Sequence, residues 1–208
     1  MNGRRIGAIV SVTLAVVALV LGLIFQNQAN FSSNYLHDQL AEKGIIFTPV
    51  ENLLPQQKNI SCLVANAGKP LLTGKQAECY AKYQIGIDLT VVDGGKTYFQ
   101  DHYNGYLARV AAGKALAEAP DAPATADLVQ KAESAQRMAD DLLAGEATRG
   151  LLLTAYGFSV IGDRLSQTAT ALFILAGLLG IAALVLFLTS RKRKIDPAID
   201  VAAEPATA

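Results

Sequence analysis

The sequence predicts an all-α membrane protein, in which two transmembrane helices flank a mostly helical extracytoplasmic domain. Two runs, residues 6–25 and 168–189, contain no charged side chain, and at 1.5 Å per helical residue each can cross a hydrocarbon core about 30 Å thick. The chain between these runs carries repeated helix-capping signals and both cysteines. Together these observations indicate a helical domain held between two membrane anchors.

The first apolar run is predicted to remain as an anchor. A cleavable signal has an apolar region of about 7 to 15 residues and then a small-x-small site, whereas this longer run is followed by Gln26-Asn27-Gln28-Ala29. Arg4 and Arg5 precede it and the basic block 191–194 follows the second run, which places both termini in the cytoplasm. The predicted division is a cytoplasmic N-terminus (1–5), transmembrane helix 1 (6–25), an extracytoplasmic helical domain (26–167), transmembrane helix 2 (168–189) and a disordered cytoplasmic tail (190–208).

The charge distribution excludes a nucleic-acid-binding domain. Residues 26–167 hold 12 of the 18 Lys and Arg and 15 of the 18 Asp and Glu, a net charge of −3, without the basic stripe that phosphate binding requires. The basic block at 191–194 lies where anionic lipid head groups are expected. Membrane lipid is therefore an expected partner, and nucleic acid is not.

Both cysteines, Cys62 and Cys79, fall in the predicted outer domain, which suggests a disulfide between them. With 16 residues between the cysteines, such a bond stabilises a domain by about 3 kcal/mol. Two buried free thiols are the alternative. The spacing is not Cys-x-x-Cys and gives little support to a redox role.

The first part of the outer domain is predicted to contain short helices separated by glycine. Residues 33–43 form a helix that Gly44 stops, and residues 45–49 form an extended apolar piece that the proline keeps out of helix. Residues 59–67 form one or two further helical turns before Gly68.

A capping box at Thr73–Gln76 predicts a helix over about residues 75–92, because its two side chains satisfy free amides at a helix start. Apolar residues alternate from Ile85 to Val91, so a strand with a hairpin turn at residues 93–95 is the alternative. We favour the helix, since Gly94 suits a left-handed helix C-terminus and the strand has no evident partner downstream.

Two longer helices follow. A second capping box, Thr97–Gln100, predicts a helix over residues 98–119, which ends before the stiff connector 120–123. A helix over residues 125–145 follows and is expected to stop at Gly145. Its apolar positions recur at spacings of four and three, as in a bundle core: Leu128, Ala132, Ala135, Ala139 and Leu142. Residues 146–161 are expected to continue towards the second membrane helix with a break near Gly157 or Gly162.

Small residues form a stripe on each membrane helix and predict that the two helices pack on each other or on partner subunits, including a homo-oligomer. The stripes are Ser11, Ala15, Ala18 and Gly22 on the first helix and Ala169, Ala176, Gly180 and Ala183 on the second. Neither run contains an ionisable residue, which argues against an ion pathway through this chain alone.

Few side chains suit catalysis or metal binding, and we assign no catalytic, cofactor-binding or metal residue. The two histidines, His37 and His102, could build an iron site only by acting together with Asp38 or Asp101. Otherwise each makes local hydrogen bonds on a partly exposed helix face. An aromatic cluster is expected to pack in the core and at its rim, with ligand binding as the alternative: Tyr80, Tyr83, Tyr98, Phe99, Tyr103 and Tyr106.

Four segments, GIIFTPVENL (44–53), SCLVANAGKPLLTGKQAECYAKY (61–83), GGKTYFQ (94–100) and RGLLLTAYGF (149–158), together resemble a family of uncharacterised actinobacterial membrane proteins. The resemblance covers most of the chain from Gly44 onward. It implies an envelope location and an unassigned role, and some members carry the label ring-opening dioxygenase.

Two functional hypotheses follow. The favoured one is a non-enzymatic envelope membrane protein whose outer helical domain binds a protein partner or an envelope lipid. The alternative is an extracytoplasmic enzyme or metal-binding protein that uses His37 and His102.

Overall fold

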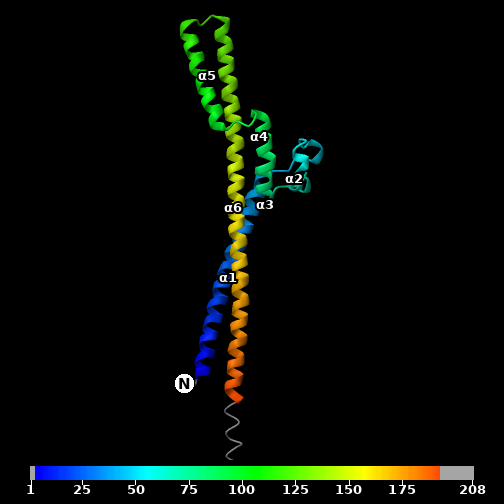
Figure 1. The fold of residues 1–208 in the computed structure, drawn as a ribbon, viewed down its shortest axis with the longest axis vertical. Coiled ribbons are helices and arrows are strands. Elements are labelled where there is room, and N and C mark those ends of the chain that lie inside the picture. The colour runs from blue at the N-terminus through cyan, green and yellow to red at the C-terminus, as the bar shows by residue number, and fades with distance from the viewer. Residues whose placement is uncertain (1–2, 193–208) are drawn as a thin grey trace, which may run out of the picture. The chain divides into compact units, whose positions relative to one another are not determined.

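The computed structural model describes residues 3–192, and over that range the fold is all-α, as predicted. Apart from helices, the described chain contains a single isolated β-bridge between Ile46 and Pro70. Residues 1–2 and most of the predicted C-terminal tail, 193–208, lie outside the described residues. The helices are α1 (Gly3–Lys43), α2 (Ser61–Asn66), α3 (Gly74–Cys79), α4 (Gly86–Asp93), α5 (Tyr98–Glu118) and α6 (Pro123–Lys192), with 3-10 turns η1 (Val50–Asn52) and η2 (Gln57–Asn59) and a π-helix η3 (Tyr80–Ile85) (Figure 1).

Contacts divide the chain into two compact units. The first contains Met1–Ser33 and Ile161–Ala208, and the second contains Asn34–Val160. α1 and α6 each contain a stretch that is long and apolar enough to cross a membrane, with a mean hydropathy of 2.9. These stretches support membrane association by length and composition.

In the first unit, α1 and α6 pack antiparallel through small residues. A Cβ atom added at Gly22 would lie 2.7 Å from the Phe173 ring, and one added at Gly7 would lie 3.5 Å from Leu186. The predicted stripe on α1 faces this seam, where Ala18 and Gly22 are buried and Ser11 and Ala15 half-buried. Of the two predicted alternatives, packing on each other or on partner subunits, the structure shows the first for α1 and α6.

For the second stripe, the prediction was wrong at one position. Ala169, Ala176 and Ala183 are buried, as expected for inward positions seven residues apart. Gly180 is exposed, and nothing lies within 4 Å of a Cβ atom placed there. Leu179 takes the half-buried position between Ala176 and Ala183, because a seam with a spacing of three and four passes through residue 179.

The second unit has one core of large apolar side chains. Phe47 is 1% exposed and packs edge-to-face on Tyr80, with the ring centroids 5.1 Å apart. The segment around Phe47 is extended, as predicted, and its amide donates to the Lys69 carbonyl over 3.0 Å. The buried members of this core are Leu40, Phe47, Leu53, Leu63, Leu71, Ala77, Cys79, Ala81 and Leu152.

The predicted disulfide between Cys62 and Cys79 is present and joins α2 to α3, with the two Cα atoms 6.2 Å apart. Cys79 is 4% exposed and belongs to the core. The bond therefore fixes α2 against the helix that carries Tyr80.

The helical interpretation of residues 75–92 is confirmed, and so are both capping boxes and the left-handed Gly94, whose φ is 63°. The helix starts at Gly74 and ends at Asp93, but its middle is the π-helix η3, which the sequence did not predict.

Three expected helix boundaries were wrong: a start at residue 33, a stop at Gly145 and a break near Gly157 or Gly162. The expected short helix 33–43 is the last part of α1, and the helix expected to stop at Gly145 is part of α6, which continues unbroken through Gly157 and Gly162 to Lys192. Gly145 serves packing instead of termination, since a Cβ atom there would lie 2.5 Å from Leu89.

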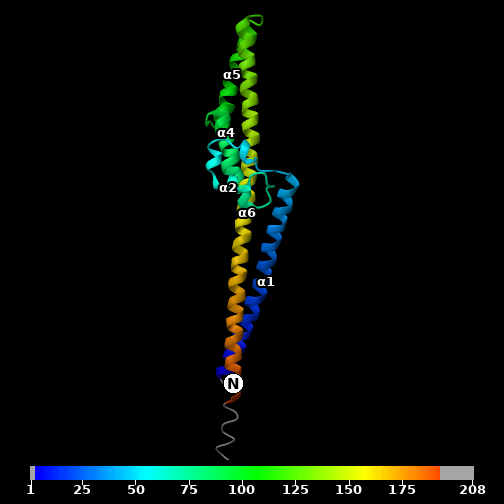
Figure 2. The same ribbon diagram turned by 90° about the vertical axis from the view of Figure 1, so that its right-hand side faces the viewer.

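The helix over α3, η3 and α4 lies against α6 in the second unit, as Figure 2 shows for α4, and glycine permits the close approach at Gly74 and Gly145. A Cβ atom at Gly74 would lie 2.1 Å from the Ser159 hydroxyl, and one at Gly86 would lie 3.9 Å from the Arg149 side chain. With the contact between Leu89 and Gly145, these pairs show that the two helices run antiparallel.

Candidate interaction face on α5

α5 and the N-terminal part of α6 form an antiparallel hairpin with a seam of small residues (Figures 1 and 2). A Cβ atom at Gly105 would lie 3.6 Å from the Ala135 carbonyl oxygen, so the two backbones approach closely. The buried residues of the hairpin are Asp101, Gly105 and Ala112 on α5 and Thr125, Ala132, Ala139 and Leu142 on α6. Because the seam accepts only small side chains over most of its length, α5 must direct its large ones elsewhere.

Five of the large apolar side chains of α5 lie on the opposite side of the helix and are exposed. Phe99 is 79% exposed, Tyr103 61%, Tyr106 53% and Val110 53%. Their spacings of four, three and four place them in one stripe, and Leu107, 46% exposed, lies beside it. We call these five residues the α5 apolar face.

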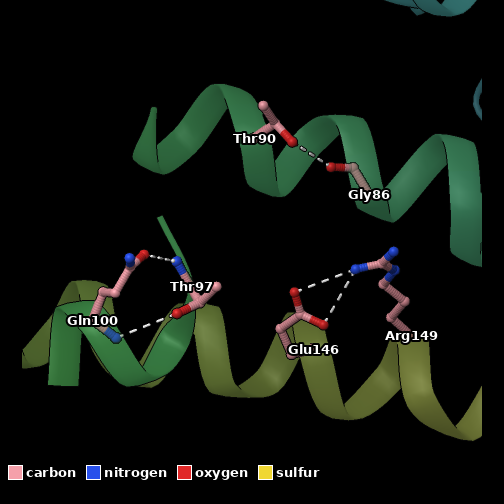
Figure 3. A network of polar contacts seen from close by, with 6 residues as sticks. All are labelled: Gly86, Thr90, Thr97, Gln100, Glu146 and Arg149. Carbon is pink, nitrogen blue, oxygen red and sulfur yellow. Dashed lines mark hydrogen bonds and ion pairs between the residues drawn. The ribbon is translucent and has the colours of Figure 1, made fainter. Parts of the chain in front are cut away.

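The start of α5 is fixed by polar contacts that hold Phe99 at the first turn. Figure 3 shows the capping box: the Thr97 hydroxyl accepts from the Gln100 amide at 3.4 Å, and the Gln100 side chain accepts from the Thr97 amide at 2.8 Å. Asp101, 6% exposed, points to the seam side and accepts from the Lys96 ammonium at 3.3 Å. The capping box thus fixes the residue at which α5 begins.

The composition of this face suits protein recognition. Tyrosine, phenylalanine and arginine are enriched where protein interfaces gain most of their binding free energy. Two tyrosines and one phenylalanine line the stripe, and Arg109 lies next to it on the same helix. Scattered exposed apolar residues need no explanation, whereas an exposed apolar stripe along one side of a helix is a candidate interaction surface.

A second polar region lies between η2 and the π-helix. The Gln57 side-chain amide donates to the Gln84 carbonyl at 3.3 Å and to the Asp88 carboxylate at 2.8 Å, while the Gln84 amide donates to the Thr48 hydroxyl. Burial raises the pKa of Asp88, and the hydrogen bond from Gln57 opposes that rise. Burial, and then the nearby Asp88 charge, raise the pKa of Tyr80.

Two buried atoms near this region, Gln84 Oε1 and Arg149 Nε, have no hydrogen-bond partner within residues 3–192. Figure 3 shows Arg149 directed to Glu146, at 3.4 Å, and the Thr90 hydroxyl bonded to the Gly86 carbonyl. The hydrogen bonds from Gln57 join η2 to Gln84 in η3 and to Asp88 in α4. They indicate a structural network that holds the π-helix in place.

The structure divides the predicted aromatic cluster. Tyr80 packs at the core against Phe47, whereas Phe99, Tyr103 and Tyr106 are exposed on α5. The expectation of core packing thus holds for Tyr80, whereas Phe99, Tyr103 and Tyr106 belong to the α5 apolar face and Tyr98 is half-buried beside His102.

The two histidines are both exposed. His102 lies beside Tyr98, with its Nδ1 atom 3.4 Å from the tyrosine hydroxyl. Within residues 3–192, no group of three or more His, Cys, Asp or Glu side chains is arranged to hold a metal ion. Asp101, the carboxylate next to His102 in sequence, is turned into the hairpin seam.

Comparison of this chain with protein-family models, curated proteins and solved structures finds no match.

The α5 apolar face was missed as a unit at the sequence level, although a signal for it was present. The spacing of residues 99, 103, 106 and 110 matches the spacing that was recognised in the next helix. Only the structure shows that α6 covers the opposite side of α5.

Proposed function

We propose that this chain is a non-enzymatic envelope protein, anchored in the membrane by two helices, whose outer helical domain binds a partner protein through the α5 apolar face. The observation that carries the proposal is the exposure of Phe99, Tyr103 and Tyr106 along one side of a helix whose other side is packed. Folding of the hairpin does not account for these side chains, because more than half of each remains exposed and none belongs to the core.

Sidedness is part of the proposal. Cations flank both apolar runs at the chain ends, and α1 and α6 are antiparallel, so one side of the membrane receives both ends. A disulfide persists in an oxidising compartment, which supports an extracytoplasmic position for Cys62 and Cys79.

Site-specific photo-crosslinking tests the binding role. A photoreactive amino acid replaces Tyr103 in the full chain in native membranes, and the matched control replaces Gln130, which is exposed on α6. We expect a discrete protein adduct from position 103 that is absent from position 130. Identical adducts from both positions, or lipid adducts alone, would contradict the proposal.

Cysteine labelling of whole cells tests the sidedness. With Cys62 and Cys79 changed to alanine, a membrane-impermeant maleimide is expected to label Gln130→Cys without lysis and Ser190→Cys only after lysis. Labelling of Ser190→Cys in intact cells would reverse the proposed orientation.

A further inference from the structure

On the basis of the proposed function, we infer that the partner segment is an amphipathic helix whose apolar stripe is flanked by carboxylates. Shape and charge along α5 carry this inference. It adds the chemistry of the partner to the proposed binding role.

The shape of the face fits one helix. Helices contact one another through apolar residues at spacings of four and three, which form a nearly straight line along each helix. On α5 this line runs from Phe99 to Val110 and is about 17 Å long at 1.5 Å per residue. The same line continues to Gly113 and Ala117, both exposed, and nothing lies within 4 Å of a Cβ atom at Gly113. A partner helix would therefore place small residues over the aromatic end and a large residue over Gly113.

The charges beside the stripe are positive. Arg109 flanks it on one side and Lys114 on the other, with His102 and Gln100 as the remaining polar flanking residues. The one acidic residue in the first turns of α5, Asp101, is buried in the seam and paired with Lys96.

The last turn of α5 carries one carboxylate, Glu118. Glu118 lies 3.8 Å from Lys114, and both side chains are well exposed, so that pair is weak. Among residues 3–192 no carboxylate lies within ion-pair distance of Arg109. Carboxylates on the partner would complement these cations.

A second copy of this chain fits the face poorly. Two α5 helices that met through this stripe would bring Arg109 against Arg109 or His102 of the other copy when antiparallel, and against Lys114 when parallel. Neither arrangement gains an ion pair, and like charges at these positions oppose assembly.

A lipid surface also fits poorly. Recognition of anionic membranes uses clusters of about four to eight cations, whereas this face has Arg109 and Lys114. The predicted outer domain that carries the face has a net charge of −3, from 12 basic and 15 acidic residues.

Designed peptides test the inference with the full chain in mild detergent. The probe is a helix of about three heptads with alanine and leucine in its apolar stripe and glutamate at the flanking positions. The control has the same composition, with the glutamates moved to the outer face. We expect the flanked probe to bind about fivefold more tightly than the control, measured by fluorescence anisotropy.

Two variants locate the binding. Arg109→Glu with Lys114→Glu is expected to weaken the flanked probe about fivefold and to favour a lysine-flanked version instead. Tyr103→Asp is expected to weaken every probe at least about tenfold, because it places a charge in the centre of the stripe. Unchanged helical circular dichroism and thermal midpoint in both variants show that the fold is retained.

Failure of the inference can be told apart from failure of the proposed function. Equal binding of the flanked probe and the control, or no response to the charge reversal, overturns the acidic-helix inference even when Tyr103 forms a protein adduct in membranes. An adduct from position 103 to a second copy of the chain, or to a non-acidic segment identified by peptide sequencing, overturns it as well. An adduct that maps to an acidic amphipathic helix supports it.

Discussion

The disulfide-linked core and the α5–α6 hairpin lie in the same compact unit but use apolar residues in opposite ways. The core buries large side chains, with Phe47, Leu63 and Leu71 each 1% exposed. The hairpin buries small ones, such as Ala112 and Ala139. The large apolar side chains of α5 remain in contact with solvent, whereas Leu142 of α6 is buried.

This difference separates stability from recognition. Large buried side chains contribute most of the hydrophobic free energy of folding, so the core is where substitutions should unfold the domain. In the hairpin, close backbone contact does the packing, and the outer side of α5 can be changed without loss of the fold. The variants below test this division, in order of decreasing expected effect.

The largest expected effect is that of Phe47→Ala. Truncation of a fully buried phenylalanine lowers the free energy of unfolding by about 3 to 5 kcal/mol, through lost burial and the cavity that remains. The matched variant Phe99→Ala removes the same side chain from a position that is 79% exposed, and should cost less than about 0.5 kcal/mol. Denaturant unfolding in detergent compares the two, and similar losses would remove the distinction between the regions.

Removal of the disulfide ranks next. Cys62→Ala with Cys79→Ala is expected to lower the free energy of unfolding by about 3 kcal/mol, since the bond closes a loop between positions 17 apart. Thermal melts of the oxidised and reduced wild type provide the control. Reduction should lower the midpoint of the wild type and leave that of the double variant unchanged.

Glycine substitutions are expected to have opposite signs at two positions. Gly74→Ala should destabilise by about 1 to 3 kcal/mol, because its Cβ atom would meet the Ser159 side chain at 2.1 Å and the helices would have to separate. Gly113→Ala should stabilise by about 0.5 to 1 kcal/mol, since its surroundings are open and alanine favours helix. A stabilising Gly74→Ala would show that the contact with α6 is loose.

The smallest effect concerns Asp88, whose pKa is raised by burial. The folded state binds this proton more tightly than the unfolded state, so its contribution to stability falls as the pH rises from about 3.9 through the raised folded pKa. Asp88→Asn keeps an oxygen acceptor for Gln57 and removes the charge. It should gain no more than about 0.5 kcal/mol at pH 7, because Asp88 is partly exposed and screened by solvent.

Thermal midpoints between pH 3 and pH 7 check this prediction. The advantage of Asp88→Asn over the wild type should shrink towards acid pH, where Asp88 is protonated in both states. Asp88→Ala is the control, since it also removes one of the two acceptors of the Gln57 side-chain amide and should destabilise. An advantage that grows towards acid pH would contradict the assigned cause.

The sequence by itself determined the features that depend on local chemistry. The charge-free runs, the two capping boxes and Gly94 each act within a few residues, and each was found where the pattern predicted it. The cysteine pair was predicted from its isolation in one segment and is joined in the structure.

Tertiary structure decided which glycines end helices and which side of α5 is covered. Gly44 and Gly94 end helices with positive φ, whereas Gly145 lies inside α6 because Leu89 packs on it. A glycine can either end a helix or allow another helix to pack closely on it. The neighbouring helix decides which of the two occurs. The same holds for α5, where both sides carry an apolar or small-residue pattern of the same period. The backbones of α5 and α6 approach closely, so the side of α5 that carries glycine and alanine is the one that α6 covers. The aromatic side is left exposed.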